Sequence, residues 1–403
     1  MSWFMGLTKK CTVTFCQISL IIIIITFSPG LEPDLDFEAY TINVRALEGP
    51  LVPNTKLNNA EHLFENELKG PEDFAVFNNE LYTSCHGGII YKVETDKLTA
   101  VLKTGKHCAG LFQEHICGRP LGIKFDKLGA LYIADAYYGL LKANLSTGEV
   151  NTLVSMEQNI EGFPPMIPNS LFIDDDVIYW TDSSTTHHLY DGLYTVLGNT
   201  RGRLLKYILS EKRNEVLMRN LNFPNGIILS KDKSFLIISE TSSARLLRYY
   251  LRGPKAGTAD IFIDNLPGFP DNILPFDDNL IVSLIHPLDS SIIFLCKHPL
   301  LRKFLARSLH IVQSSFKIFN YFIENQLFDK IIHWIGHFES LEILKPFAKS
   351  QSISIILNYN GQILGSLQAN DSNISSVSSV IKYKNYYYLG SPMNPYIGRV
   401  QIT

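Results

Sequence analysis

Oxygen-bearing side chains recur directly after prolines that are spaced at nearly regular intervals. The residues that follow Pro71, Pro120, Pro168, Pro224 and Pro270 are Glu72, Leu121, Asn169, Asn225 and Asp271. Four of these five carry carboxylate or amide oxygens, which are the ligands that a hard cation such as Ca²⁺ prefers. An Asn or Asp after proline often forms a turn, so one such residue alone would indicate only a turn. Four at one position of a repeat favour a metal site.

The charges and donor types of this set narrow the choice of metal. Glu72 and Asp271 supply two negative charges, and Asn272 could add a further oxygen. The set contains neither thiolate nor imidazole, which argues against zinc and copper. Magnesium is the alternative, but the amide ligands and the large ring favour one calcium ion.

A repeat that carries these residues predicts how they are positioned. Each proline opens a short apolar strand, followed by a polar turn and a second apolar strand; a sixth copy, over residues 377–390, lacks the proline. The prolines are 49, 48, 56 and 46 residues apart, a spacing that suits a four-stranded propeller blade. We therefore predict an all-β, six-bladed β-propeller in which equivalent positions form a ring. A β-sandwich or two separate β domains would not require a repeated strand entrance.

One segment interrupts the repeat between the fifth and sixth blades. Apolar residues over about 294–345 recur at helical rather than alternating spacing. We expect an amphipathic helical cap over one face of the propeller. It either packs on the blades as a lid or presents a basic, apolar surface to a membrane, and the two interpretations are compatible.

The N-terminus carries a candidate transmembrane helix. Lys9 and Lys10 precede an apolar run over 11–27, and acidic residues follow it. This order places the N-terminus in the cytoplasm and the rest across the membrane. A cleaved signal peptide is the alternative, but residues 27–30 form a poor cleavage site. We favour a single-pass type II membrane protein, with a tail and signal anchor over 1–30, a stem and first propeller strand over 31–69, and a lumenal or extracellular propeller over 70–403, in the endoplasmic reticulum or plasma membrane.

The remaining composition agrees with an extracytoplasmic globular protein. Cys108 and Cys117 lie nine residues apart in a predicted loop, where an oxidising compartment favours a disulfide over two free thiols. Glycosylation sequons begin at Asn144, Asn370 and Asn373. The net charge is −3 and the sequence has no basic stripe, which argues against nucleic-acid binding.

Four motifs resemble the strictosidine synthase-like propellers. They are CGRPLGI at 117–123, YWTDSS at 179–184, FPNG at 223–226 and PGFPDNI at 267–273. The likeness runs from about Gly70 to the C-terminus. The wider superfamily includes paraoxonases and gluconolactonases, whose metal ligands match Glu72, Asn169, Asn225, Asp271 and, for paraoxonases, Asn272.

The resemblance implies a calcium-dependent, arylesterase-like hydrolase of esters or lactones. The metal would polarise the substrate carbonyl, and Asp271 would act as general base or activate water.

Three departures from the family patterns limit this expectation. Ser170 replaces an Asp of the second, structural calcium site of paraoxonases, although Asp73 is present. The paraoxonase histidine pair would fall near Leu121 and Asp135, and neither is His. The catalytic Glu of the plant synthase would fall within 377–380, where no carboxylate occurs, so alkaloid-forming condensation is disfavoured.

Two non-enzymatic interpretations stand beside the hydrolase. In one, the protein is a non-catalytic binding module in which calcium only locks the blades. In the other, it is a receptor-type propeller, suggested by YWTD at 179–182, but this motif occurs once rather than in every blade. We favour the hydrolase, with a small ester or lactone as substrate and the membrane as a partner through the N-terminal helix and the cap.

Overall fold

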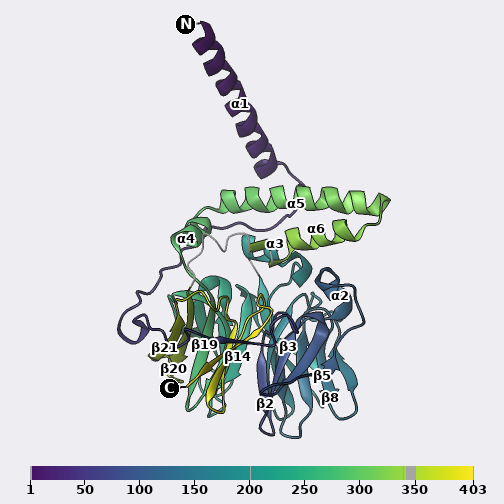
Figure 1. Cartoon of the computed structure of the whole chain (residues 1–403), viewed down its shortest axis with the longest axis vertical. Coiled ribbons are helices and arrows are strands. Elements are labelled where there is room, and N and C mark those ends of the chain that lie inside the picture. Colours follow the sequence, from purple (N-terminus) through teal and green to yellow (C-terminus); the bar gives the residue numbers. More distant parts are fainter. Residues whose placement is uncertain (1, 200, 339, 342–350, 403) are drawn as a thin grey trace.

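Six antiparallel sheets of four strands each form the body of the protein (Figure 1). The computed structural model describes residues 2–199, 201–338, 340–341 and 351–402. The first strands of successive sheets contact one another, so they form the inner wall of a ring of blades. This arrangement confirms the predicted all-β, six-bladed propeller.

The first four blades follow one another in chain order, and in each the strands are hydrogen-bonded in sequence. Their strands are β2 (Phe74–Phe77), β3 (Glu80–Cys85), β4 (Ile89–Val93), β5 (Leu98–Lys103); β6 (Pro120–Phe125), β7 (Leu131–Asp135), β8 (Gly139–Asn144), β9 (Glu149–Val154); β10 (Pro168–Asp174), β11 (Val177–Asp182), β12 (Gly202–Ile208), β13 (Arg213–Leu221); β14 (Pro224–Leu229), β15 (Phe235–Glu240), β16 (Arg245–Tyr250) and β17 (Ala259–Ile263).

The last two blades contain an insertion and the closure of the ring. Their strands are β18 (Gly268–Phe276), β19 (Asn279–Pro287), β20 (Ser352–Leu357), β21 (Ile363–Ala369); β22 (Ser379–Tyr383), β23 (Tyr386–Gly390), β24 (Ile397–Gln401) and β1 (Glu61–Leu63). Strand β1 comes from the N-terminal side and pairs with β24, with Glu61 opposite Arg399. The two ends of the propeller are therefore joined in one sheet, which leaves no open edge between the first and last blades.

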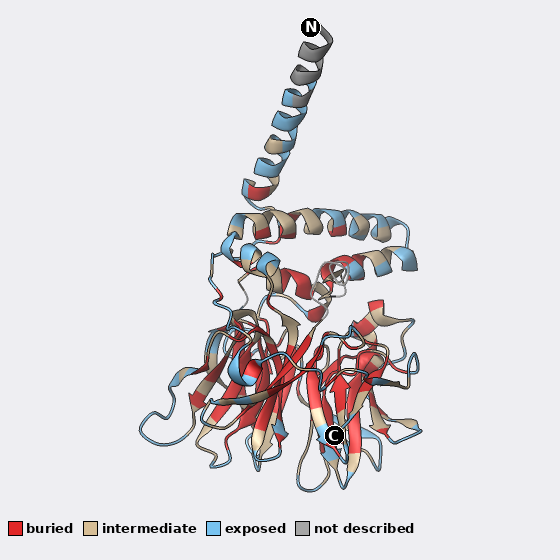
Figure 2. Ribbon diagram, turned by 60° about the vertical axis from the view of Figure 1, so that its left-hand side comes forward, coloured by how far each residue is buried: buried red, intermediate tan, exposed pale blue. Residues whose placement is uncertain are grey.

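Turn chemistry and burial explain why the repeat forms strands. Asn78 and Asn79 join β2 to β3 with positive φ angles of 47° and 57°, which is the conformation that a tight hairpin requires. Buried aliphatic side chains of neighbouring blades pack together, as Ile237, Ile273 and Val282 do between the fourth and fifth blades. Figure 2 shows that buried residues gather in the blades, whereas exposed residues predominate on α1 (Ser2–Phe27).

The helical insertion lies within the fifth blade, which corrects the predicted position between blades five and six. Helices α4 (Ser290–Lys297), α5 (Pro299–Phe322) and α6 (Gln326–Gly336) leave the sheet after β19, and the chain returns to it as β20. The prediction was wrong because β20 and β21 have no proline-marked entrance, so the blade seemed to end after its second strand. Residues 339 and 342–345 of the predicted insertion lie outside the described residues.

Helix α1 stands on the same side of the propeller as the cap (Figure 1). The buried guanidinium of Arg307 on α5 donates from Nη1 to the backbone oxygens of Thr26 and Ser28, over 3.0 and 2.9 Å. These bonds satisfy carbonyls at the end of α1 that have no partner within the helix. Within the part of the chain whose side chains are described, no helix combines the length and apolar character needed to cross a membrane.

Candidate metal centre

The innermost strand of four blades carries a β-bulge at its entrance. The strand register shifts between Pro120 and Gly122 in β6, between Pro168 and Leu171 in β10, between Pro224 and Ile227 in β14, and between Pro270 and Ile273 in β18. A bulge locally turns the backbone and re-aims a side chain. The residue after the proline therefore leaves the ordinary alternation of the strand at the same point of each of these four blades.

The four strongest predicted ligands converge on one cavity of about 200 Å³. Glu72, Asn169, Asn225 and Asp271 all line it, and none is more than 6% exposed. Leu121, from the remaining proline-marked blade, lines the same cavity and contributes an apolar wall. Asn272 is buried beside the cavity rather than on its described lining, and its Nδ2 donates to the backbone oxygen of Glu72 over 3.4 Å.

The close approach of the inner strands explains why glycine follows Asn225. A Cβ atom on Gly226 would lie 2.5 Å from the backbone oxygen of Asp271. Glycine lets the fourth and fifth blades approach closely enough for their two candidate ligands to share the cavity.

Hydrogen bonds fix the orientation of the ligands and leave oxygens available. Asn169 donates from Nδ2 to Ser183 Oγ over 3.0 Å, and this hydroxyl donates to the backbone oxygen of Pro224 over 2.7 Å. The buried Oδ1 atoms of Asn225 and Asp271 have no hydrogen-bond partner among the described residues. A buried acceptor without a partner is costly, so this donor set fits a cation that would satisfy both oxygens.

The raised pKa values of the two buried carboxyl groups in the cavity also indicate that a positive charge would be stabilised there. Burial raises the pKa of Glu72 to about 7; the nearby Asp73 carboxylate acts in the same direction, and Arg119 opposes both. Burial, followed by repulsion from Glu72, raises the pKa of Asp271 well above its ordinary value. Two desolvated carboxylates disfavour each other's ionisation, and a divalent cation between them would reverse that effect.

Arg119 supplies only part of the missing charge. Its guanidinium is 2% exposed, donates from Nη1 to the backbone oxygen of Gly70 over 3.0 Å, and lies 3.5 Å from Glu72 Oε2. With Glu72 and Asp271 both ionised, one arginine leaves a net negative charge in the cavity.

Asp73, the carboxylate expected at a second calcium site, is already neutralised by Lys124. Asp73 accepts hydrogen bonds at Oδ2 from Lys124 Nζ over 2.7 Å and from the backbone of Ile123 over 3.0 Å, and at Oδ1 from the backbone of Phe74 over 2.8 Å. A second cation would have to displace the ammonium group, so the arrangement of Asp73 is consistent with one ion only.

A second set of acidic residues lies at the ends of β7, β11 and β15. These residues accept hydrogen bonds from backbone amides. Asp135 Oδ1 accepts from the amide of Arg119 over 3.1 Å, Asp182 Oδ1 from Ile167 over 2.9 Å, and Glu240 Oε1 from Asn222 over 2.8 Å. These carboxylates hold the loops that lead into the innermost strands. They are not part of the cavity lining described above.

Several cavity residues carry no repeat signal, and three of them, His86, His337 and Phe338, were missed by the sequence analysis. His86 follows β3, His286 belongs to β19, and His337 and Phe338 follow helix α6; all four line the cavity. They are brought there by loops and by the cap. The spacing of His333 and His337 within an expected helix was the one signal that could have drawn attention to this group.

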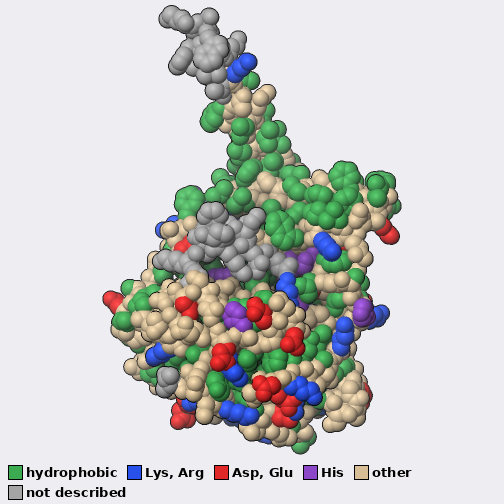
Figure 3. Space-filling model, viewed as in Figure 1, with side chains coloured by type: hydrophobic (Ala, Val, Ile, Leu, Met, Phe, Trp, Pro, Cys, Tyr) green, Lys and Arg blue, Asp and Glu red, His purple; other side chains and the backbone are tan. Residues whose placement is uncertain are grey.

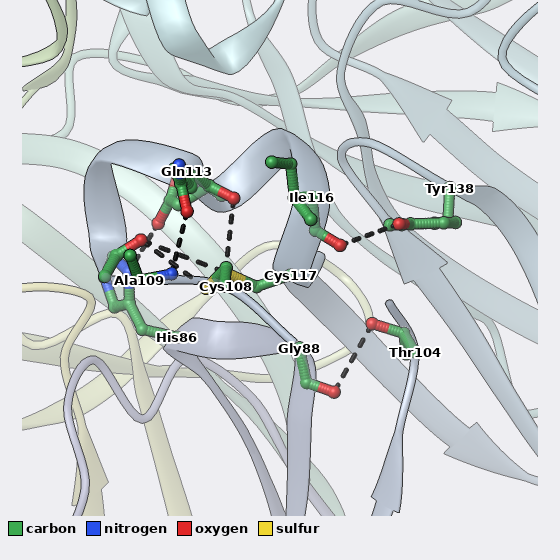
Figure 4. The surroundings of a disulfide bond; sticks show 11 residues. His86, Gly88, Thr104, Cys108, Ala109, Gln113, Ile116, Cys117 and Tyr138 are labelled. Atoms are coloured by element: carbon green, nitrogen blue, oxygen red, sulfur yellow. Dashed lines mark hydrogen bonds and ion pairs between the residues drawn. A yellow bond between two sulfur atoms is a disulfide. The ribbon is translucent and has the colours of Figure 1, made fainter. Parts of the chain in front are cut away.

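The predicted disulfide between Cys108 and Cys117 is present (Figure 4), with Cα atoms 5.5 Å apart. It closes a loop that is further held by Gln113, whose Oε1 accepts from the amide of Ala109 over 2.7 Å. In the described part of the chain, Cys85 and Cys296 are buried free thiols.

The sequon asparagines differ in exposure. Asn144 and Asn370 are exposed, whereas Asn373 is half-buried and its Nδ2 donates to the backbone oxygen of Ala60. A glycan on Asn373 would therefore disturb an existing contact.

Solved structures of other propellers share this fold. A calcium-binding protein, regucalcin, from Agrobacterium tumefaciens aligns with a TM-score of 0.50 and 9% identity, covering 85% of this chain and 93% of its own. A luciferin-regenerating enzyme aligns with a TM-score of 0.51 and 12% identity, covering 85% and 94%. At these identities the likeness concerns the fold alone.

Family models and related sequences identify the group to which the chain belongs. Residues 169–254 match the strictosidine synthase family, and residues 49–93 match the strictosidine synthase-like N-terminal family. Adipocyte plasma membrane-associated protein Hemomucin of Drosophila melanogaster is 36% identical over 98% of this chain and 70% of its own length. The human adipocyte plasma membrane-associated protein is 32% identical over 100% and 92%. The chain therefore belongs to the strictosidine synthase-like family of adipocyte plasma membrane-associated proteins.

Proposed function

We propose that this protein is a calcium-dependent hydrolase of small esters or lactones. The observation that carries the proposal is the convergence of Glu72, Asn169, Asn225 and Asp271, from four blades, on one buried cavity in which two oxygens have no partner among the described residues. Carboxylate and amide oxygens without sulfur suit calcium. The calcium-binding protein regucalcin, which shares the fold, adds support for the choice of ion.

The wall of the cavity indicates what kind of substrate it would accept. Apolar side chains predominate around the oxygen ligands, among them Leu121, Phe223, Phe269, Phe338 and Met393. Such a surface binds the hydrocarbon part of an ester or lactone and excludes water from the reacting carbonyl. The volume of about 200 Å³ restricts the substrate to a small molecule.

The roles of the residues follow from their placement. Bound calcium would polarise the substrate carbonyl and stabilise the negative charge that develops on its oxygen. Asp271 is assigned as general base, because its carboxylate lines the cavity and has a second oxygen besides the Oδ1 that would bind the cation. In that role it takes a proton from the attacking water.

The test compares Asp271→Asn with Asp277→Asn, a matched change of an exposed aspartate that pairs with Lys382. In the purified full-length chain, thermal melting and phenyl acetate hydrolysis are measured with calcium and with chelator. We expect chelation to lower both in the wild type, and Asp271→Asn to abolish hydrolysis while Asp277→Asn does not.

Two results would contradict the hydrolase. If calcium raises the melting midpoint but the wild type never hydrolyses an ester or lactone, the ion is structural and the protein is a binding module. If chelation changes neither property, the metal centre itself is wrong.

We also propose that the cap lies on the membrane that holds α1, with the propeller on the lumenal or extracellular side. Helices α5 and α6 expose large apolar side chains, including Ile318, Phe319, Phe322 and Trp334, which are 59%, 57%, 76% and 44% exposed. Figure 3 shows apolar side chains over α1 and over the helical layer above the propeller. An amphipathic helix with such a face binds the membrane interface, and the names of the relatives place them at the plasma membrane.

Trp334 can report the contact directly. The full-length chain would be reconstituted into vesicles with or without brominated lipids, which quench nearby tryptophans. We expect stronger quenching for the wild type than for Trp334→Phe. Equal quenching of the two chains would show that Trp334 does not reach the lipid and would contradict the membrane-bound cap.

A further inference from the structure

A second cluster of potential metal ligands lies where the cap meets the propeller, and its chemistry differs from that of the calcium candidate. Glu114, His333 and His337 each offer a ligand atom, and these atoms all lie within 4.8 Å of one another. The three residues are 0%, 3% and 5% exposed. Two imidazoles and a carboxylate are thus gathered in the interior.

Two independent elements bring these residues together. Glu114 begins the short helix α2 (Glu114–Cys117), inside the loop that the Cys108–Cys117 disulfide closes (Figure 4). His333 lies in the last turn of α6 and His337 is the residue that caps its end, and their rings stack with centroids 4.6 Å apart. The cluster therefore joins the loop between the first two blades to a helix that is inserted in the fifth.

The carboxylate of Glu114 is oriented by a partner outside the trio. His86 Nδ1 lies 2.5 Å from Glu114 Oε1, and His86 Nε2 lies 3.0 Å from the backbone oxygen of Pro392. The other oxygen, Oε2, lies 3.5 Å from His337 Nε2. Carboxylates that ligate a metal are commonly hydrogen-bonded by a residue outside the ligand set, which fixes their orientation.

We propose that Glu114, His333 and His337 form a zinc site that fastens the cap helix α6 to the propeller. Two histidines and one carboxylate are a ligand set that Zn²⁺ takes in proteins, with the fourth position left for water or another ligand. Calcium prefers a shell of oxygens. The protein would then bind two different metals in two adjacent but separate places.

The position of the site indicates what the zinc would do. His337 lines the central cavity, whereas His333 lines a separate cavity of about 540 Å³ together with Phe112, Lys330 and Trp334. The cluster thus stands between the two cavities. A bound ion would hold the cap closed over the channel, because it adds bonds between elements that are far apart in the sequence.

The test uses the purified full-length chain after removal of metals and reloading with calcium. Zinc binding is measured by calorimetry, and Co²⁺ is added as a spectroscopic substitute for zinc. We expect one zinc per chain and the visible absorption of tetrahedral Co²⁺. His333→Gln and His337→Gln should each weaken zinc binding by more than about 100-fold, since a ligand is lost outright where loss of an outer partner costs about 10–100-fold.

The controls separate this proposal from the calcium centre. His298→Gln changes an exposed histidine at the start of α5 that stacks on Phe294, and it should leave zinc binding intact. In all three variants calcium should still raise the melting midpoint, which shows that they fold and that the two sites are independent.

The proposal is overturned if the wild type binds no zinc, or if both cluster variants bind it as tightly as the control. If the cluster variants fail to fold, the Co²⁺ spectrum of the wild type still decides the matter. Octahedral bands without nitrogen ligation would contradict the site.

Discussion

Two sets of acidic and amide residues lie at the same end of the blades, but they differ in how far their oxygens are hydrogen-bonded. The cavity ligands directly follow the prolines that open or precede the innermost strands, and two of them, Asn225 and Asp271, have an oxygen without a partner in the described structure. The strand-end carboxylates lie opposite the same prolines in the register, as Asp182 does opposite Pro168. Asp182 uses both of its oxygens, one on the backbone of Ile167 and one on Arg203.

The difference shows that hydrogen-bond satisfaction, rather than burial or charge, separates a candidate binding residue from a structural one. Asp182 and Asp271 are 0% and 3% exposed, so burial does not distinguish them. A buried carboxylate with saturated oxygens stabilises the backbone around it, whereas one with a free oxygen is a cost that a ligand can offset.

The largest effect is expected for Asp182→Ala. This change leaves the 1% exposed guanidinium of Arg203 without its carboxylate partner, which lies 2.6 Å away. Breaking a buried ion pair costs about 3–5 kcal/mol of the free energy of unfolding. Chemical denaturation should show the same loss with calcium and with chelator. The exposed pair partner Asp278, changed to Ala, is the control, with an expected cost of less than about 1 kcal/mol.

Asn225→Ala should instead affect the stabilisation by calcium more than the stability of the calcium-free protein. The unfolding free energy in chelator should fall by no more than about 1.5 kcal/mol, because the variant loses only the hydrogen bond of Asn225 to the Asp271 side chain, while Oδ1 has no partner in the described structure. The stabilisation by calcium should disappear, which amounts to about 2.7 kcal/mol when calcium is present at 100 times its dissociation constant. Melting curves at several calcium concentrations measure this. An unchanged calcium response would remove Asn225 from the ligand set.

Thr104→Val tests Asp135, one of the carboxylates at the strand ends, by removing a single hydrogen bond to it. Thr104 Oγ1 donates to Asp135 Oδ2 over 2.6 Å, and valine keeps the shape but not the donor. We expect a loss of about 1.5–3 kcal/mol, as for a hydrogen bond to a charged group, again independent of calcium. A loss confined to the calcium-bound protein would mean that Asp135 belongs with the cavity ligands.

The smallest effect is expected in the pH dependence of the chelated protein. Burial raises the pKa of Glu72 from 4.5 to about 7 in the fold, so the folded state binds this proton more tightly than the unfolded state does. The stability gained from protonation is complete at low pH and is lost as pH rises through 7. The melting midpoint in chelator should therefore fall as the pH rises from about 4.5 to about 7 and level off above that, and Glu72→Gln should reduce that slope. An equal slope in the variant would contradict the assignment to Glu72.

The repeat made the fold and most of the cavity predictable. Because prolines at a nearly constant interval mark the same point of each blade, the residues after them had to occupy equivalent places around the axis. Glu72, Asn169, Asn225 and Asp271 lie together for that reason. Asn272 was expected with them but lies beside the cavity, where its Nδ2 donates to the backbone oxygen of Glu72.

Features that depend on contacts between distant segments were not predictable in the same way. The insertion was placed after the fifth blade because β20 and β21 look like any pair of apolar strands. Nothing local assigns Arg119 to Glu72, or Glu114 to His337, since each pair is joined only when loops and cap meet over the channel.

The sequence by itself determined the number of blades, the oxygen chemistry of the ring and the local disulfide, because each is set by a short motif or by its repetition. Only the tertiary structure decided which buried carboxylates have an oxygen without a hydrogen-bond partner among the described residues, as Asp271 does, and which have both oxygens bonded, as Asp182 does. That distinction depends on the partners that reach each carboxylate from other segments, and a one-dimensional pattern does not contain those distances.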